Sequence, residues 1–124
     1  MFDCGYVDDA MTKAEIKNVY EKTNEILDPH TVIGYKVAKE ATDRPIVSLA
    51  TASPYKFSID VLKSIDVEVK DEFEAMHKLN EITGEPIPEG LAKLESLPIL
   101  HKDVIEIEEM YNVVENAMED LFNV

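Results

Sequence analysis

Thr51 lies at the end of a predicted strand and just before a predicted helix start, a position where a hydroxyl group could contact a ligand. It is the last residue of the run 45–51 (Pro-Ile-Val-Ser-Leu-Ala-Thr). This run is nearly continuously apolar, which is typical of a strand covered on both faces. Ser53 and Pro54 follow and indicate a helix start, because serine caps helices well and proline suits the first helical position. Open α/β sheets bind ligands at such strand ends. The alternative is that Thr51 only caps local backbone.

The other reactive residue types form no recognisable constellation. His30, His77 and His101 are scattered without metal-ligand spacing, so we interpret them as surface or helix-start histidines. The four glycines are not clustered, which argues against a phosphate-binding loop. We therefore predict no catalytic residue and no metal site in this chain.

Charge and length limit the function classes. With 124 residues, we expect residues 1–124 to form a single domain. Acidic residues number 26 against 12 basic ones, a net charge of -14 that disfavours nucleic acid, membrane surfaces and phosphorylated ligands. Cys4 is the only cysteine, which excludes an internal disulfide, and neither a secretory signal nor a membrane-spanning run is present. We expect a reduced, cytoplasmic protein.

The elements that would position Thr51 are mostly helices. The pattern predicts an α/β fragment that is predominantly α-helical, with four to six helices and one main strand at residues 45–51. Residues 66–70 alternate valine with charged residues and fit either a brief second strand or a connector. The predicted helices cover residues 12–27, 29–41, 54–65, 71–83 and 103–122, with a short turn at 89–94.

Capping signals set the helix starts. Thr12 and Glu15 have the spacing of a capping box, and Asp28 before a proline indicates a fresh start. Residues 84–102 form a proline-punctuated connection, after which Asp103, with Glu106 three residues later, is predicted to cap the last helix. Its apolar stripe consists of Ile107, Met110, Tyr111, Val114, Ala117, Met118 and Leu121.

Three stretches together resemble the C-terminal end of threonine synthases. An acidic pair and Thr12 open a helix, residues 27–31 read Leu-Asp-Pro-His-Thr, and residues 49–57 read LATASPYKF. Their order and spacing match the family, as does the proline-punctuated tail. Residues 66–84 match least. The resemblance covers nearly the whole chain.

The resemblance implies a fold-type-II pyridoxal-phosphate enzyme. Such a lyase of threonine biosynthesis converts O-phospho-L-homoserine and water to L-threonine and phosphate. The coenzyme acts as the electron sink of the reaction. In the family, the threonine of the TAHP-like motif donates a hydrogen bond to the pyridine nitrogen, which would make Thr51 a cofactor-binding residue. The chain departs from the motif at Ser53, where histidine is common, and at Tyr55, where a small residue is common.

The resemblance also implies that most of the active site lies elsewhere. The family's coenzyme-binding lysine lies upstream of this stretch, so we interpret Lys56 as a solvated first-turn residue. We expect the chain alone to be inactive and to bind no pyridoxal phosphate. Its partner would be the upstream cofactor-binding part of the same enzyme.

An apolar strand without neighbours favours self-association. Unpaired backbone groups cost on the order of 1 to 3 kcal/mol each when buried, so we expect a homo-oligomer formed through residues 46–51 or residues 103–122. The alternative function is a stand-alone acidic helical module that binds a partner protein without catalysis. A small regulatory ligand-binding domain has no motif in its favour.

Overall fold

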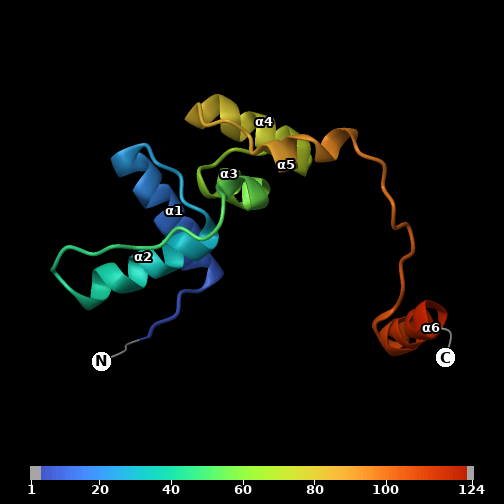
Figure 1. Ribbon diagram of the computed structural model, residues 1–124. Coiled ribbons are helices and arrows are strands. Elements are labelled where there is room, and N and C mark those ends of the chain that lie inside the picture. Colours follow the sequence, from blue (N-terminus) through green and yellow to red (C-terminus); the bar gives the residue numbers. More distant parts are fainter. Residues whose placement is uncertain (1–3, 123–124) are drawn as a thin grey trace.

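A computed structural model describes residues 4–122, and these residues are mainly helical (Figure 1). The six α-helices are α1 Asp9–Thr23, α2 Pro29–Ala41, α3 Ser58–Ser64, α4 Glu72–Thr83, α5 Glu89–Ala92 and α6 Met110–Phe122. The short 3₁₀ helices are η1 Pro54–Phe57, η2 Leu94–Ser96 and η3 Ile107–Glu109. The predicted predominance of helix is confirmed. Within the described range, no helix combines the length and apolar character needed to cross a bilayer.

The predicted strand at residues 45–51 is wrong, because the structure has no strand between residues 4 and 122. The segment runs back along α2 without regular structure (Figure 1). None of its backbone groups hydrogen-bonds to another described residue. A strand needs a second extended segment to complete its ladder, and the neighbouring helices supply none. Residues 66–70 also form no strand. The Val67 N–H instead bonds to the carbonyl oxygen of Leu62, 3.0 Å away, which closes the turn after α3.

The first helix begins earlier than the capping-box pattern predicts. Asp8 is the N-cap, and its carboxylate accepts a hydrogen bond from the Met11 N–H at 2.8 Å. Thr12 lies inside the first turn, where its hydroxyl group donates to the Asp8 carbonyl oxygen at 2.8 Å. Asparagine at position 24 ends the helix in the left-handed region, with φ of 61°. The predicted helix over residues 12–27 therefore also ends too late.

The second helix matches its prediction at both ends. Asp28 is 1% exposed and accepts hydrogen bonds from the backbone N–H groups of His30 and Thr31, at 2.9 and 3.2 Å. Buried Glu15 of α1 faces two ammonium groups of α2, Lys36 at 3.8 Å and Lys39 at 3.9 Å. Apolar contact and this charged cluster together hold α1 against α2.

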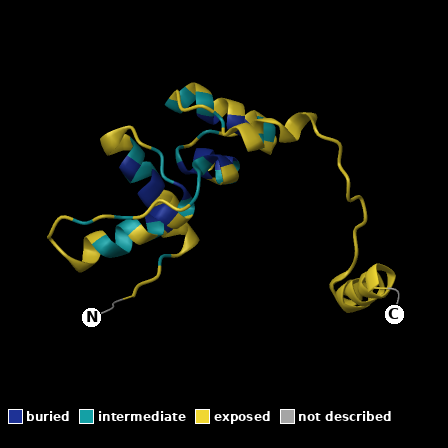
Figure 2. Cartoon of the chain, in the orientation of Figure 1, coloured by how far each residue is buried: buried dark blue, intermediate teal, exposed yellow. Residues whose placement is uncertain are grey.

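Two small apolar clusters form the core (Figure 2). The first joins α1 to α2, and its buried residues are Ile16, Val19 and Val32. The second joins η1 and α3 to α4, and its buried residues are Tyr55, Val61, Leu62, Ala75, Met76 and Leu79. Asp71 caps α4, and Gly84 ends it with φ of 71°, within one residue of the predicted range of residues 71–83.

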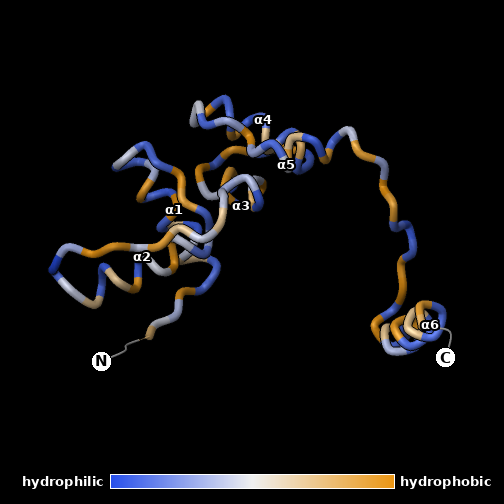
Figure 3. Tube along the Cα trace, viewed as in Figure 1, coloured by the Kyte–Doolittle hydropathy of each residue, from blue (hydrophilic) through white to orange (hydrophobic). Residues whose placement is uncertain are grey.

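The C-terminal helix lies apart from the rest of the molecule (Figures 1 and 2). An irregular stretch after η2 leads away from α5, and every described residue of α6 is exposed. The predicted cap at Asp103 is wrong, since η3 starts the helix with Glu106 as its N-cap. The Glu109 carboxylate accepts a hydrogen bond from the Glu106 N–H at 3.0 Å, which favours this later start. Figure 3 shows apolar positions recurring along both the stretch and α6.

Candidate functional site

Thr51 lies at the exposed end of the irregular segment, two residues before the helix cap. Its hydroxyl group makes no hydrogen bond with the described residues, so a local capping role for Thr51 is not observed. The cap is Ser53, whose hydroxyl oxygen accepts a hydrogen bond from the Tyr55 N–H at 3.3 Å. Pro54 occupies the first position of η1, as predicted. The turn is thus stabilised without Thr51, whose hydroxyl group is available to another molecule or chain.

Tyr55 fixes this turn to α4. The side chain is 6% exposed, and its hydroxyl group donates a hydrogen bond to the carbonyl oxygen of Glu85. The Asn80 side-chain amide donates to the same oxygen at 2.6 Å. Sequence reasoning did not find this role. The only signal was the departure from the small residue that is common at this position in the family.

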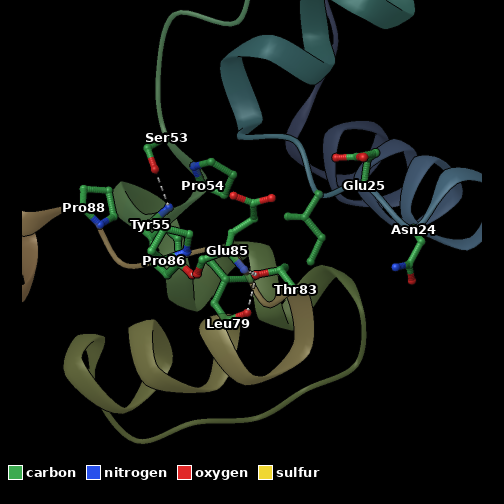
Figure 4. Close-up of a pocket in the computed structure, with 11 residues that line it drawn as sticks. Asn24, Glu25, Ser53, Pro54, Tyr55, Leu79, Thr83, Glu85, Pro86 and Pro88 are labelled. Atoms are coloured by element: carbon green, nitrogen blue, oxygen red, sulfur yellow. Dashed lines mark hydrogen bonds between the residues drawn. The ribbon is translucent and has the colours of Figure 1, made fainter.

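A cavity of about 400 Å³ lies beside the turn (Figure 4). Its walls come from the end of α1, the Ser53 turn and the segment after α4, with Pro54, Pro86 and Pro88 as apolar surfaces. Glu25 and Glu85 also line it and bring negative charge. Such a lining repels phosphate, so the cavity is unsuited to the phosphate group of a coenzyme.

The remaining polar residues do not add a reactive centre. Lys56 is exposed on η1 and makes no ion pair with the described residues. The His30 ring packs against Phe57 with a centroid distance of 5.0 Å, and His77 lies 3.3 Å from a Glu95 carboxylate oxygen. In the part of the chain that the structure covers, no three histidine, cysteine or acidic side chains are grouped as a metal site.

Helices, an apolar segment without backbone partners and a proline turn define the class of protein: a mainly helical segment that exposes the Thr51 hydroxyl group and has no grouped catalytic residues within residues 4–122. Comparison with known proteins gives the family. A family model described as "Threonine synthase, C-terminal" matches residues 31–122, and the chain belongs to that family. The match includes residues 66–84, where the motifs are weakest.

A curated relative agrees with the family match. Threonine synthase of Pseudomonas aeruginosa is 31% identical over 121 residues, which cover 95% of this chain and 20% of the relative. The chain therefore spans about a fifth of that protein's length.

Proposed function

We propose that this chain acts as the C-terminal segment of a threonine synthase-like enzyme, which converts O-phospho-L-homoserine and water to L-threonine and phosphate. Its task there is to place Thr51 against the coenzyme. The observation that carries the proposal is the apolar segment of residues 45–51, which is unpaired along its backbone and ends at an unpartnered hydroxyl group.

The segment has one supported side and one free side. Ser48 lies close to α2, since its hydroxyl oxygen would be 3.8 Å from a Cβ atom on Gly34. Val47 and Leu49, on alternate positions, are 90% and 78% exposed. An extended segment with exposed apolar side chains and free N–H and C=O groups is a template for strand addition. We propose that the upstream part of the enzyme supplies the adjacent strand and covers Val47 and Leu49.

The residues present fit one contact with pyridoxal phosphate. A threonine hydroxyl group can donate to the pyridine nitrogen and adds no charge there. When bound, the coenzyme supplies the electron sink that the reaction needs. The phosphate site and the coenzyme-binding lysine have no counterpart among the described residues, so we assign both to the upstream part.

Replacement of Thr51 in the full-length enzyme tests the proposal. Thr51→Val removes the hydroxyl group and keeps the shape, so we expect a shifted coenzyme absorbance band and a kcat lower by about 3- to 10-fold, the value of one neutral hydrogen bond. Thr51→Ser keeps the donor and serves as the matched control. If Thr51→Val leaves spectrum and turnover unchanged, Thr51 does not contact the coenzyme.

The alternative function is an acidic helical module that binds a partner protein without catalysis. The full exposure of α6 favours it. Adding pyridoxal phosphate and O-phospho-L-homoserine to the purified chain is informative for both functions. We expect neither a coenzyme absorbance band nor phosphate release. Stoichiometric coenzyme binding with turnover would overturn the proposal that the site is shared with an upstream part.

A further inference from the structure

No hydrogen bond restrains Thr51 from its N-terminal side within the described part of the chain. The backbone groups of residues 45–51 make none to another described residue, so the segment before Thr51 does not fix its place. The nearest anchored residue is Ser53, which lies two residues further on and accepts the Tyr55 N–H at 3.3 Å. The position of the Thr51 hydroxyl group in this chain therefore follows the position of the Ser53 turn.

Local hydrogen bonds shape this turn and join it to α3. The Lys56 N–H donates to the Ser53 carbonyl oxygen at 3.1 Å. The Ser58 hydroxyl group, which is fully buried at the start of α3, donates to the Tyr55 carbonyl oxygen at 2.8 Å. Each of these bonds joins residues that are no more than three positions apart. They fix the form of the turn, but they do not set where it lies relative to α4.

The Glu85 carbonyl oxygen is a fixed acceptor at the end of α4. It accepts hydrogen bonds from the Tyr55 hydroxyl group and from the Asn80 side-chain amide, the latter at 2.6 Å. The Glu85 N–H donates to the Thr83 hydroxyl oxygen at 3.1 Å (Figure 4). That hydroxyl group in turn donates to the Leu79 carbonyl oxygen at 2.8 Å. Residue 85 is therefore held to the last turn of α4 through both its N–H and its C=O.

The ring and the hydroxyl group of Tyr55 contribute differently to the packing of the turn on α4. The ring belongs to the apolar cluster of α3 and α4, and apolar burial is not directional. A hydrogen bond, in contrast, weakens steeply as its length and angle depart from the optimum. Within the described chain, the bond from Tyr55 to Glu85 is the only hydrogen bond between residues 53–58 and residues 72–88. The hydroxyl group therefore orients the turn more closely than the ring does.

We propose that Tyr55 is a positioning residue for Thr51. Its hydroxyl group, held by the Glu85 carbonyl oxygen, keeps the Ser53 turn in the place from which Thr51 donates to the coenzyme. The inference rests on the proposed contact between Thr51 and pyridoxal phosphate, and Tyr55 acts through that contact. A misplacement of about 1 Å can cost an enzyme up to about 100-fold in rate, so a small shift of the turn is sufficient to weaken the contact.

Tyr55→Phe in the full-length enzyme tests the proposal, because it removes the hydroxyl group and keeps the ring. We expect the coenzyme absorbance band to shift in the same direction as in Thr51→Val. The kcat should fall by about 2- to 5-fold, with a KM for O-phospho-L-homoserine within about 2-fold of that of the unaltered enzyme. In the double variant, Tyr55→Phe should add no further loss to that of Thr51→Val, because one residue acts through the other.

Asp71→Ala is the matched control for a loss of stability. It removes a hydrogen-bonded cap at the opposite end of α4 and leaves the turn untouched, so the band and kcat should stay as in the unaltered enzyme. A similar loss in Asp71→Ala would overturn the positioning role.

Two further outcomes separate this inference from the proposed function. If Thr51→Val changes the band and Tyr55→Phe does not, or if the two losses multiply in the double variant, the positioning role is overturned and the proposed function stands. If Thr51→Val changes neither the band nor kcat, the proposed contact with the coenzyme fails, and the positioning role fails with it.

Discussion

The Tyr55 hydroxyl group donates a hydrogen bond to the Glu85 carbonyl oxygen, 30 residues further along the chain. This contact joins the turn that follows residues 45–51 to the segment that leaves α4. The same oxygen accepts from the Asn80 amide, so the junction is held from two sides. The position of Thr51 therefore depends indirectly on α4.

Removal of this hydroxyl group should weaken the junction. We expect Tyr55→Phe to lower the free energy of unfolding by about 0.5 to 1.5 kcal/mol, because one hydrogen bond is lost while Asn80 still satisfies the Glu85 oxygen. Urea unfolding followed by circular dichroism measures the change. Tyr35→Phe is the control, since the Tyr35 hydroxyl group has no partner among the described residues. Equal stability of the two variants would contradict the role of Tyr55.

Buried and exposed helix caps should contribute different amounts to the free energy of unfolding. Asp28 also accepts a hydrogen bond from the Thr31 hydroxyl group, and it is 1% exposed. We expect Asp28→Ala to cost about 2 kcal/mol or more, because a buried network loses its acceptor. Asp71→Ala removes an exposed cap of the same kind from α4 and should cost about 1 kcal/mol. Similar losses in thermal or urea unfolding would show that burial adds nothing at Asp28.

An ion pair between α1 and the turn after α3 should make stability depend on alkaline pH. The pKa of Lys17 is raised above 10.5, chiefly because its ammonium group donates a hydrogen bond to Asp66 and then because of charge attraction. A folded-state pKa above the unfolded one gives a stabilisation that is fully present below the unfolded value and is lost as pH rises through the folded one.

The measurement compares the unaltered protein with Lys17→Gln. We expect a small difference in urea midpoint at about pH 9 that disappears by about pH 12. Lys63→Gln is the control, because Lys63 makes no ion pair within residues 4–122. A difference that persists unchanged through this pH range would rule out the charged form of Lys17 as its source.

The second helix could be predicted from sequence because its signals are local. Asp28 and Pro29 act within one turn of the residues that they cap. The start of α1 was missed because Asp8 and Thr12 are both competent caps, four residues apart, and the apolar spacing does not decide between them. Local patterns identify helices more reliably than their ends.

Features that depend on residues far away in the sequence could not be predicted from local patterns. The apolar composition of residues 45–51 is typical of a strand, but pairing requires a partner that the described residues do not contain. The turn at Ser53 was predicted from its own residues. The Tyr55 contact was not, because it joins residues that only the packing of α3 against α4 brings together.

We propose that the isolated chain self-associates through residues 45–51, since this segment has no charged residue whereas α6 is acidic. Antiparallel pairing of two copies would satisfy both backbones and cover Val47. Analytical ultracentrifugation should show a mass that rises with concentration toward that of two chains. Val47→Lys should abolish the rise, and Val114→Lys, a matched change on α6, should leave it intact. A single-chain mass at every concentration, or a loss caused only by Val114→Lys, would refute this association.

Removal of residues 97–124 should leave the remaining helices as stable as before. All described residues of α6 are exposed, and the residues of both apolar clusters lie between Ile16 and Leu91, so the truncation removes none of them. A helix of 13 residues without tertiary contacts is only marginally stable in water, which means that it contributes little to cooperative unfolding. We expect the free energy of unfolding of the truncated protein, measured by urea unfolding, to lie within about 0.5 kcal/mol of that of the full chain. A loss of several times that amount would mean that α6 packs against the other helices in solution, and its exposed apolar side chains would then be covered by the same chain.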